Sequence, residues 1–133
     1  MGLIGISRPA SGAEHMLSHY WEMDFISRGE FPELHGIKVG IATVVIAEIF
    51  QQMKDDLPKD MRNNLPEPKY CKDLLDRIAA PDTPKEIGIE KELFYKSLLE
   101  GYRVRDRYSI LQLAVEKRKI KEIAKRVTEL FYA

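Results

Sequence analysis

The strongest constraint on the fold is an apolar segment of about twenty residues that contains neither a proline nor a turn dipeptide. The segment runs from about residue 35 to residue 55. Its apolar residues recur at helical spacing: Ile37, Ile41, Val44, Val45, Ile49 and Met53. The middle of the segment, Thr43-Val44-Val45-Ile46, is β-branched, which is typical of strands. Length decides between the two, because strands rarely exceed about ten residues. The segment is therefore predicted to be a helix buried on most sides.

The rest of the sequence also predicts helices, over about 13–25, 69–79, 90–101, 106–116 and 120–132. Ser11 or Gly12 is the expected start of the first helix, with Glu14 three residues after Ser11 as in a capping box. Proline-bearing polar residues over about 56–68 predict a connector, and Thr83 is expected to cap a helical turn that ends at Gly88. No strand alternation is evident. We expect an all-α helical bundle that forms one domain over residues 1–133.

The composition argues against several classes of function. Basic and acidic residues number 21 each, so no net charge attracts the chain to nucleic acid or to an anionic membrane. The single cysteine, Cys71, allows no internal disulfide and fits a reducing compartment; it reads as a structural thiol. The apolar start is too short for a signal peptide, and the longest apolar run is too short for a membrane span. We therefore expect a cytoplasmic protein that binds neither nucleic acid nor membrane.

All three histidines, His15, His19 and His35, fall within 21 residues. Imidazole is a common metal ligand, and His15 and His19 are four residues apart, on one face of the predicted helix. This layout predicts a metal site built across a pair of helices. The alternative for a lone helical pair is a histidine that packs in the core and bonds a carbonyl. Glu14 precedes His15, whereas the zinc-protease signature needs a glutamate just after its first histidine.

Longer motifs surround these histidines. The first is Ser7-Arg8-Pro9-Ala10-Ser11-Gly12-Ala13-Glu14-His15 with Ser18-His19, and the second is Leu34-His35-Gly36-x-Lys38-Val39-Gly40. Together they resemble the glycerol-1-phosphate dehydrogenases, in the superfamily of iron-dependent alcohol dehydrogenases, glycerol dehydrogenase and dehydroquinate synthase. Segments 83–88 and 104–111 are similar to later parts of the same family. The resemblance runs from about Gly2 to Tyr132 and implies the helical fold of the dehydroquinate synthase-like alpha domain.

The resemblance implies a site for metal and substrate. Enzymes of this family place their active site between a dinucleotide-binding domain and a helical domain, and hold one divalent metal through an aspartate and two histidines. His15 and His35 match those two histidines, with zinc expected and iron or nickel as alternatives. His19 matches a position near nicotinamide and substrate, where a proton relay and simple packing are both open. Arg8 and Ser11 would lie in a loop beside the substrate, with Arg8 either at its phosphate end or facing solvent.

The same resemblance implies a reaction. Two imidazoles and one carboxylate leave open positions on zinc, so the metal would polarise the C2 oxygen of dihydroxyacetone phosphate. Hydride would come from the nicotinamide of NAD(P).

The sequence also departs from the family. It contains no Gly-x-Gly-x-x-Gly motif, and the aspartate ligand has no counterpart, so we expect NAD(P) to bind only with a missing N-terminal domain. The expected function is the C-terminal metal- and substrate-binding half of an NAD(P)-dependent sn-glycerol-1-phosphate dehydrogenase, inactive alone. Expected partners are a separate dinucleotide-binding half and further copies of the chain, joined through exposed apolar surface. The alternative is a non-catalytic helical remnant that serves association.

Overall fold

The structure, a computed structural model, describes residues 12–29, 35–57, 59–62, 65, 67–78, 80–81, 83–104 and 109–132, with only the backbone of His35, Gly36 and Met61. Over these residues it contains helices and no strand, which confirms the all-α prediction. The α-helices are α1 (Ala13–Ser27), α2 (His35–Gln52), α3 (Lys59–Arg62), α4 (Pro68–Arg77), α5 (Lys91–Glu100), α6 (Ile110–Glu116) and α7 (Ile120–Tyr132). Three 3-10 turns join them: η1 (Lys54–Asp56), η2 (Pro84–Ile87) and η3 (Gly101–Arg103).

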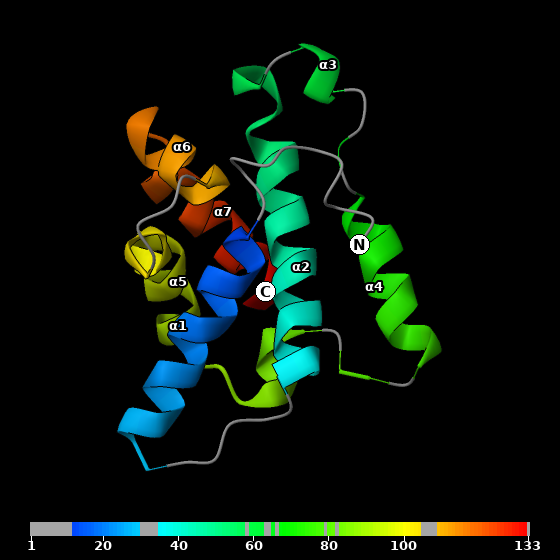
Figure 1. Cartoon of the computed structure of the whole chain (residues 1–133), viewed down its shortest axis with the longest axis vertical. Coiled ribbons are helices and arrows are strands. Elements are labelled where there is room, and N and C mark those ends of the chain that lie inside the picture. Colours follow the sequence, from blue (N-terminus) through cyan, green and yellow to red (C-terminus); the bar gives the residue numbers. More distant parts are fainter. Residues whose placement is uncertain are drawn as a thin grey trace.

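Helix α2 lies at the centre of the molecule and contacts α1, α4, α6 and α7 (Figure 1). Its β-branched middle is helical, and residues on most of its sides are buried, as predicted: Ile41, Ala42, Val44, Val45, Ile46, Ala47, Ile49 and Phe50. The hydroxyl of Thr43 donates to the carbonyl of Val39 at 2.7 Å, so this polar side chain is satisfied within the helix. Burial against several neighbours therefore outweighs the strand preference of the segment.

Helix α4 packs on α2 at the edge of the fold (Figure 1). The two helices approach closely at Gly40, where an added Cβ would lie 2.9 Å from Cδ2 of Leu75. The other side of α4 is exposed and carries Tyr70, Leu74 and Ile78. An amphipathic helix thus uses only part of its apolar face inside the described fold.

Most predicted helix boundaries agree with the structure, and two do not. The helix predicted from residue 106 begins only at Ile110, because extended Ser109 caps it and accepts a hydrogen bond from the backbone N–H of Gln112 at 3.3 Å. The central helix, predicted to about residue 55, ends at Gln52 and is followed by η1, and the predicted connector over 56–68 contains α3. There, Arg62 folds back and donates from Nε to the carbonyl of Leu57 at 2.9 Å.

Turn chemistry explains the start of α1 and the end of η2. Gly12 is the residue that caps α1, with φ of 94°, and Gly88 ends η2 with φ of 82°. Both angles lie in the left-handed region that favours glycine. Thr83 donates to the Glu86 carboxylate at 2.9 Å, so the expected capping residue bonds a side chain instead of a backbone N–H.

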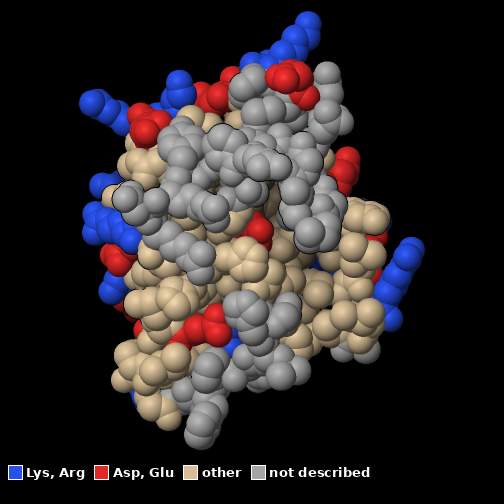
Figure 2. Space-filling model, in the orientation of Figure 1, with Lys and Arg blue, Asp and Glu red and all other residues tan. Residues whose placement is uncertain are grey.

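Charged side chains of both signs are visible on one face of the molecule (Figure 2). On the face shown in Figure 2, basic and acidic side chains alternate around the edges, and neither sign forms a continuous patch among the described residues. Among the described helices, none has the length and apolar character needed to cross a membrane.

Candidate metal and substrate site

The predicted site begins on α1, which a buried polar anchor holds against α5. Nε1 of Trp21 donates to Oγ of Ser97 at 2.9 Å, and Oγ of Ser97 donates to the carbonyl of Phe94 at 2.6 Å. The rings of Trp21 and Phe94 stack with centroids 6.3 Å apart. All three side chains are fully buried, so the side of α1 that faces the core is fixed in position.

The opposite side of α1 carries two of the predicted site residues. His15 lies in the first turn and His19 one turn later, and both are exposed. Ser18, between them, is buried and donates to the carbonyl of His15 at 3.2 Å. The anchored helix therefore presents two accessible imidazoles on one face, and the exposed apolar side chains of Met23 and Ile26 continue that surface.

The third histidine begins α2. Helices α1 and α2 run antiparallel (Figure 1), and Nζ of Lys38 lies 5.3 Å from the centroid of the Phe25 ring. The first turn of α2 thus meets the last turns of α1. His15 precedes Phe25 by ten residues, about 15 Å along a helix axis. The structure brings His15 and His19 together and places the backbone of His35 toward the other end of α1.

The remaining predicted residues have no described side chain. Arg8 and Ser11 lie outside the described residues, as does the imidazole of His35. Among the side chains that are described, no group of three His, Cys, Asp or Glu is arranged to hold a metal ion. The ligand pair of His15 and His35 therefore stays a prediction.

A second link joins α1 to α5 beside His19. The hydroxyl of Tyr20 donates to Oε1 of Glu100 at 2.8 Å. Burial, and then the hydrogen bond and the charge of Glu100, raise the pKa of Tyr20 to about 12. Tyr20 is therefore a protonated donor at neutral pH, and it fixes the middle of α1 to the end of α5.

Comparison with known proteins identifies relatives of this chain. No family model matches it. Curated proteins named glycerol-1-phosphate dehydrogenase (NAD(P)+) match at 34% identity in Geobacillus stearothermophilus and 36% in Natronomonas pharaonis. The first match covers 84% of this chain and 34% of the relative, and the second covers 88% and 29%. The chain is a relative of the glycerol-1-phosphate dehydrogenases.

This relationship confirms the resemblance inferred from the histidine motifs. A third glycerol-1-phosphate dehydrogenase, from Korarchaeum cryptofilum, is 34% identical over 84% of this chain. The chain spans about a third of the length of the glycerol-1-phosphate dehydrogenases it matches.

Sequence reasoning missed one residue near the predicted site. Lys38 belongs to the second histidine motif that resembles the glycerol-1-phosphate dehydrogenases, but the sequence analysis assigned it no role. In the structure it is fully buried at the contact of α1 and α2. The sequence did contain a signal: Lys38 lies between Ile37 and Ile41 in a segment predicted to be buried on most sides. A lysine in such a segment is notable, because lysine is almost never fully buried without a partner.

Proposed function

We propose that this chain forms the metal- and substrate-binding part of an NAD(P)-dependent glycerol-1-phosphate dehydrogenase that reduces dihydroxyacetone phosphate. The relationship to enzymes with that name, across 84% of the chain, carries the proposal. Because the chain spans about a third of those relatives, we assign NAD(P) binding to a further, dinucleotide-binding part that complements it.

The donor chemistry of α1 fits a divalent metal. His15 offers an accessible imidazole on a helix that the Trp21–Ser97 bond anchors, and an anchored ligand costs less ordering on binding. We assign His15 and His35 as ligands of zinc, with iron or nickel as alternatives, and an aspartate outside this chain as the third ligand. When bound, the metal supplies a Lewis acid for the C2 oxygen of the substrate.

The other predicted residues act on the substrate. His19, one turn from His15 and exposed, is assigned a proton transfer at the C2 oxygen. Arg8 is assigned to the phosphate group, because a guanidinium matches phosphate oxygens in geometry and charge. Ser11 is assigned a hydrogen bond to the substrate from the same loop.

A chimera tests the proposal. This chain would replace the matching third of the Geobacillus stearothermophilus relative, and oxidation of NADH by dihydroxyacetone phosphate would be followed with zinc present. Because the backbone of His35 lies toward the end of α1 that is remote from His15, the two ligand assignments are tested separately. We expect His15→Ala and His35→Ala to remove both zinc and activity. His19→Ala should retain zinc and lower kcat by about 100-fold, the scale of a lost general acid.

The exposed residue Lys121 on α7 provides the control, because Lys121→Ala should leave zinc content and activity unchanged. A chimera that folds and binds NADH but never oxidises it would contradict the enzymatic proposal. Unchanged zinc content in both His15→Ala and His35→Ala would contradict the ligand assignment.

We also propose that the chain associates with further copies of itself. The observation that favours association is the exposed apolar surface on α1 and α4, which includes Met23, Ile26, Tyr70 and Ile78. Self-association is compatible with the enzymatic role. In the alternative, a non-catalytic association module, self-association is the only function of the chain.

A further inference from the structure

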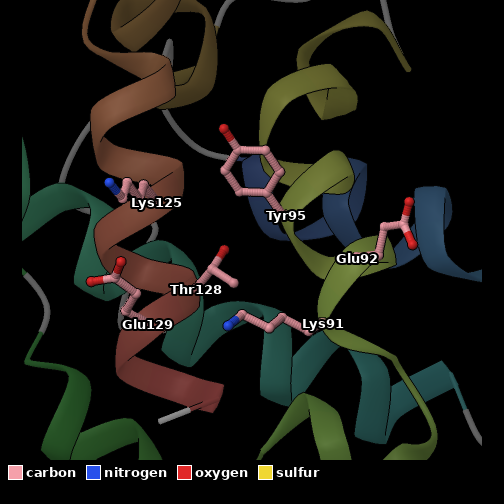
Figure 3. Close-up of a pocket in the computed structure, with 6 residues that line it drawn as sticks. All are labelled: Lys91, Glu92, Tyr95, Lys125, Thr128 and Glu129. Atoms are coloured by element: carbon pink, nitrogen blue, oxygen red, sulfur yellow. The ribbon is translucent and has the colours of Figure 1, made fainter.

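A groove separates α5 from α7 on a part of the fold that the proposed function does not use. Its cavity volume is about 450 Å³, within the range of small-molecule sites. Helix α5 contributes one wall and α7 the other (Figure 3). The lining residues are Lys91, Glu92, Tyr95, Lys125, Thr128 and Glu129. The spacing within each helix places its three residues along one side of that helix.

Thr128 is the unusual residue of this groove. Its side chain is 3% exposed, and its hydroxyl has no hydrogen-bond partner in the described part of the chain. The buried serines differ, since Ser18 and Ser97 donate to carbonyls and Ser109 caps α6. A buried hydroxyl without a partner is destabilising, so native proteins rarely keep one. The Thr128 hydroxyl is a polar group that a ligand in the groove would satisfy.

Figure 3 shows which side chains face the gap between the helices. The hydroxyl of Thr128 points from α7 toward Tyr95, and the ammonium of Lys91 extends from α5 toward α7. In this view the side chains of Lys125 and Glu129 extend from α7 on the side away from Tyr95, and Glu92 extends from α5 away from α7, so these three residues line the rim of the groove. The gap between the two helices therefore holds one ammonium, one buried hydroxyl and one aromatic ring, and Glu92, Lys125 and Glu129 line its rim.

The groove has firm walls at one end. The ring of Phe94 lies 5.7 Å from that of Phe131 and 5.2 Å from that of Tyr132, between centroids. The Tyr132 hydroxyl also donates to the carbonyl of Ile89 at 2.5 Å. This aromatic cluster holds the beginning of α5 against the end of α7. A preformed groove binds a ligand at a lower entropic cost than one that must order on binding.

We propose that this groove binds a small organic anion. Its carboxylate or phosphate group would lie between the ammonium of Lys91 and the hydroxyl of Thr128, and its apolar body would pack on the Tyr95 ring. The site is separate from the histidine face, because α1 meets α5 through Phe94 and Ser97.

Titration of the whole chain with benzoate or inorganic phosphate, followed by two-dimensional amide NMR, tests the site. We expect benzoate to cause saturable shifts at Lys91, Tyr95 and Thr128, with a Kd in the millimolar range or lower. Lys91→Gln and Thr128→Val should each raise that Kd at least tenfold. Lys72→Gln, which removes an equal charge from an exposed position on α4 outside the groove, should change it less than twofold.

Folding of the variants is checked separately. Thr128→Val removes an unpartnered hydroxyl at constant shape, so its melting temperature should rise. The matched change Thr43→Val removes the hydrogen bond from the Thr43 hydroxyl to the carbonyl of Val39, so the melting temperature of this variant should not rise. Absence of saturable shifts with benzoate would overturn the proposal, as would equal losses of affinity in Lys91→Gln and Lys72→Gln. Phosphate binding as tight as benzoate would overturn the role of the Tyr95 ring.

Discussion

At the residue scale, the contact of Trp21 with Ser97 is the polar link that most directly positions the histidine face. Ser97→Ala leaves the buried N–H of Trp21 without its acceptor. We expect a loss of about 1–3 kcal/mol in the free energy of unfolding, measured by urea denaturation. Ser27→Ala is the matched control: it removes an exposed serine of α1 and should cost less than about 0.5 kcal/mol.

The same contact predicts coupling between its partners. Trp21→Phe removes the donor, so Ser97→Ala in that background should cost less than it does in the parent. Equal costs in the two backgrounds would show that the hydrogen bond contributes no stability.

Tyr20 makes the stability depend on alkaline pH. The pKa of Tyr20 rises from 10.0 to about 12 in the folded protein, through burial and then through its bond to Glu100. The unfolded chain therefore releases this proton near pH 10, whereas the folded chain keeps it until about pH 12. The stabilisation is complete below pH 10 and is lost as the pH rises toward 12.

Tyr20→Phe should therefore reduce the fall in urea midpoint between pH 9.5 and pH 11.5. Part of the fall should remain, because burial also raises the pKa of Tyr132. Exposed Tyr70 supplies the control, since Tyr70→Phe should leave the pH profile unchanged. A profile that is the same in Tyr20→Phe and the parent would contradict this account.

At the scale of elements, the sequence was sufficient to predict the helices but not all of their ends. Helical spacing and length correctly identified α2 despite its β-branched middle, and α7 has the predicted bounds. The predicted start of α6 was wrong by four residues. The helical spacing of apolar residues begins before Ser109, but Ser109 caps the helix, so the helix starts only at Ile110. Helix α3 was missed, since a single helical turn closed by Arg62 leaves no periodic signal.

Gly40 of α2 lies where the side chain of Leu75 from α4 packs against it. A glycine inside a helix costs about 1 kcal/mol relative to alanine, but a Cβ here would lie 2.9 Å from Cδ2 of Leu75. Gly40→Ala in the parent should gain less than that, because the end of the Leu75 side chain must shift. In a Leu75→Ala background the same change should gain about 1 kcal/mol. A urea-based double-mutant cycle measures the difference, and equal effects in both backgrounds would exclude the contact.

At the scale of the whole molecule, the resemblance of the sequence motifs to a known family predicted more about function than hydrophobic periodicity and charge did. The relationship to the glycerol-1-phosphate dehydrogenases was recoverable from the histidine motifs, because those strings are long and specific. The groove between α5 and α7 was not, since Lys91, Tyr95 and Thr128 lie on two helices far apart in the sequence. Only packing shows that the hydroxyl of Thr128 is buried and has no partner among the described residues. The periodicity of a single segment does not predict contacts between segments that are far apart in the sequence.

The exposed side of α4 predicts how whole molecules associate. Tyr70, Leu74 and Ile78 are 65%, 43% and 73% exposed and recur every four residues, so they form one apolar stripe. The chain has no net charge to oppose contact between copies. We expect self-association that increases with concentration in sedimentation velocity, and Leu74→Lys with Ile78→Lys should shift the chain to monomer. Leu130→Lys, at an exposed position of α7, should leave the association intact; an equal effect there would show that the α4 stripe is not the contact.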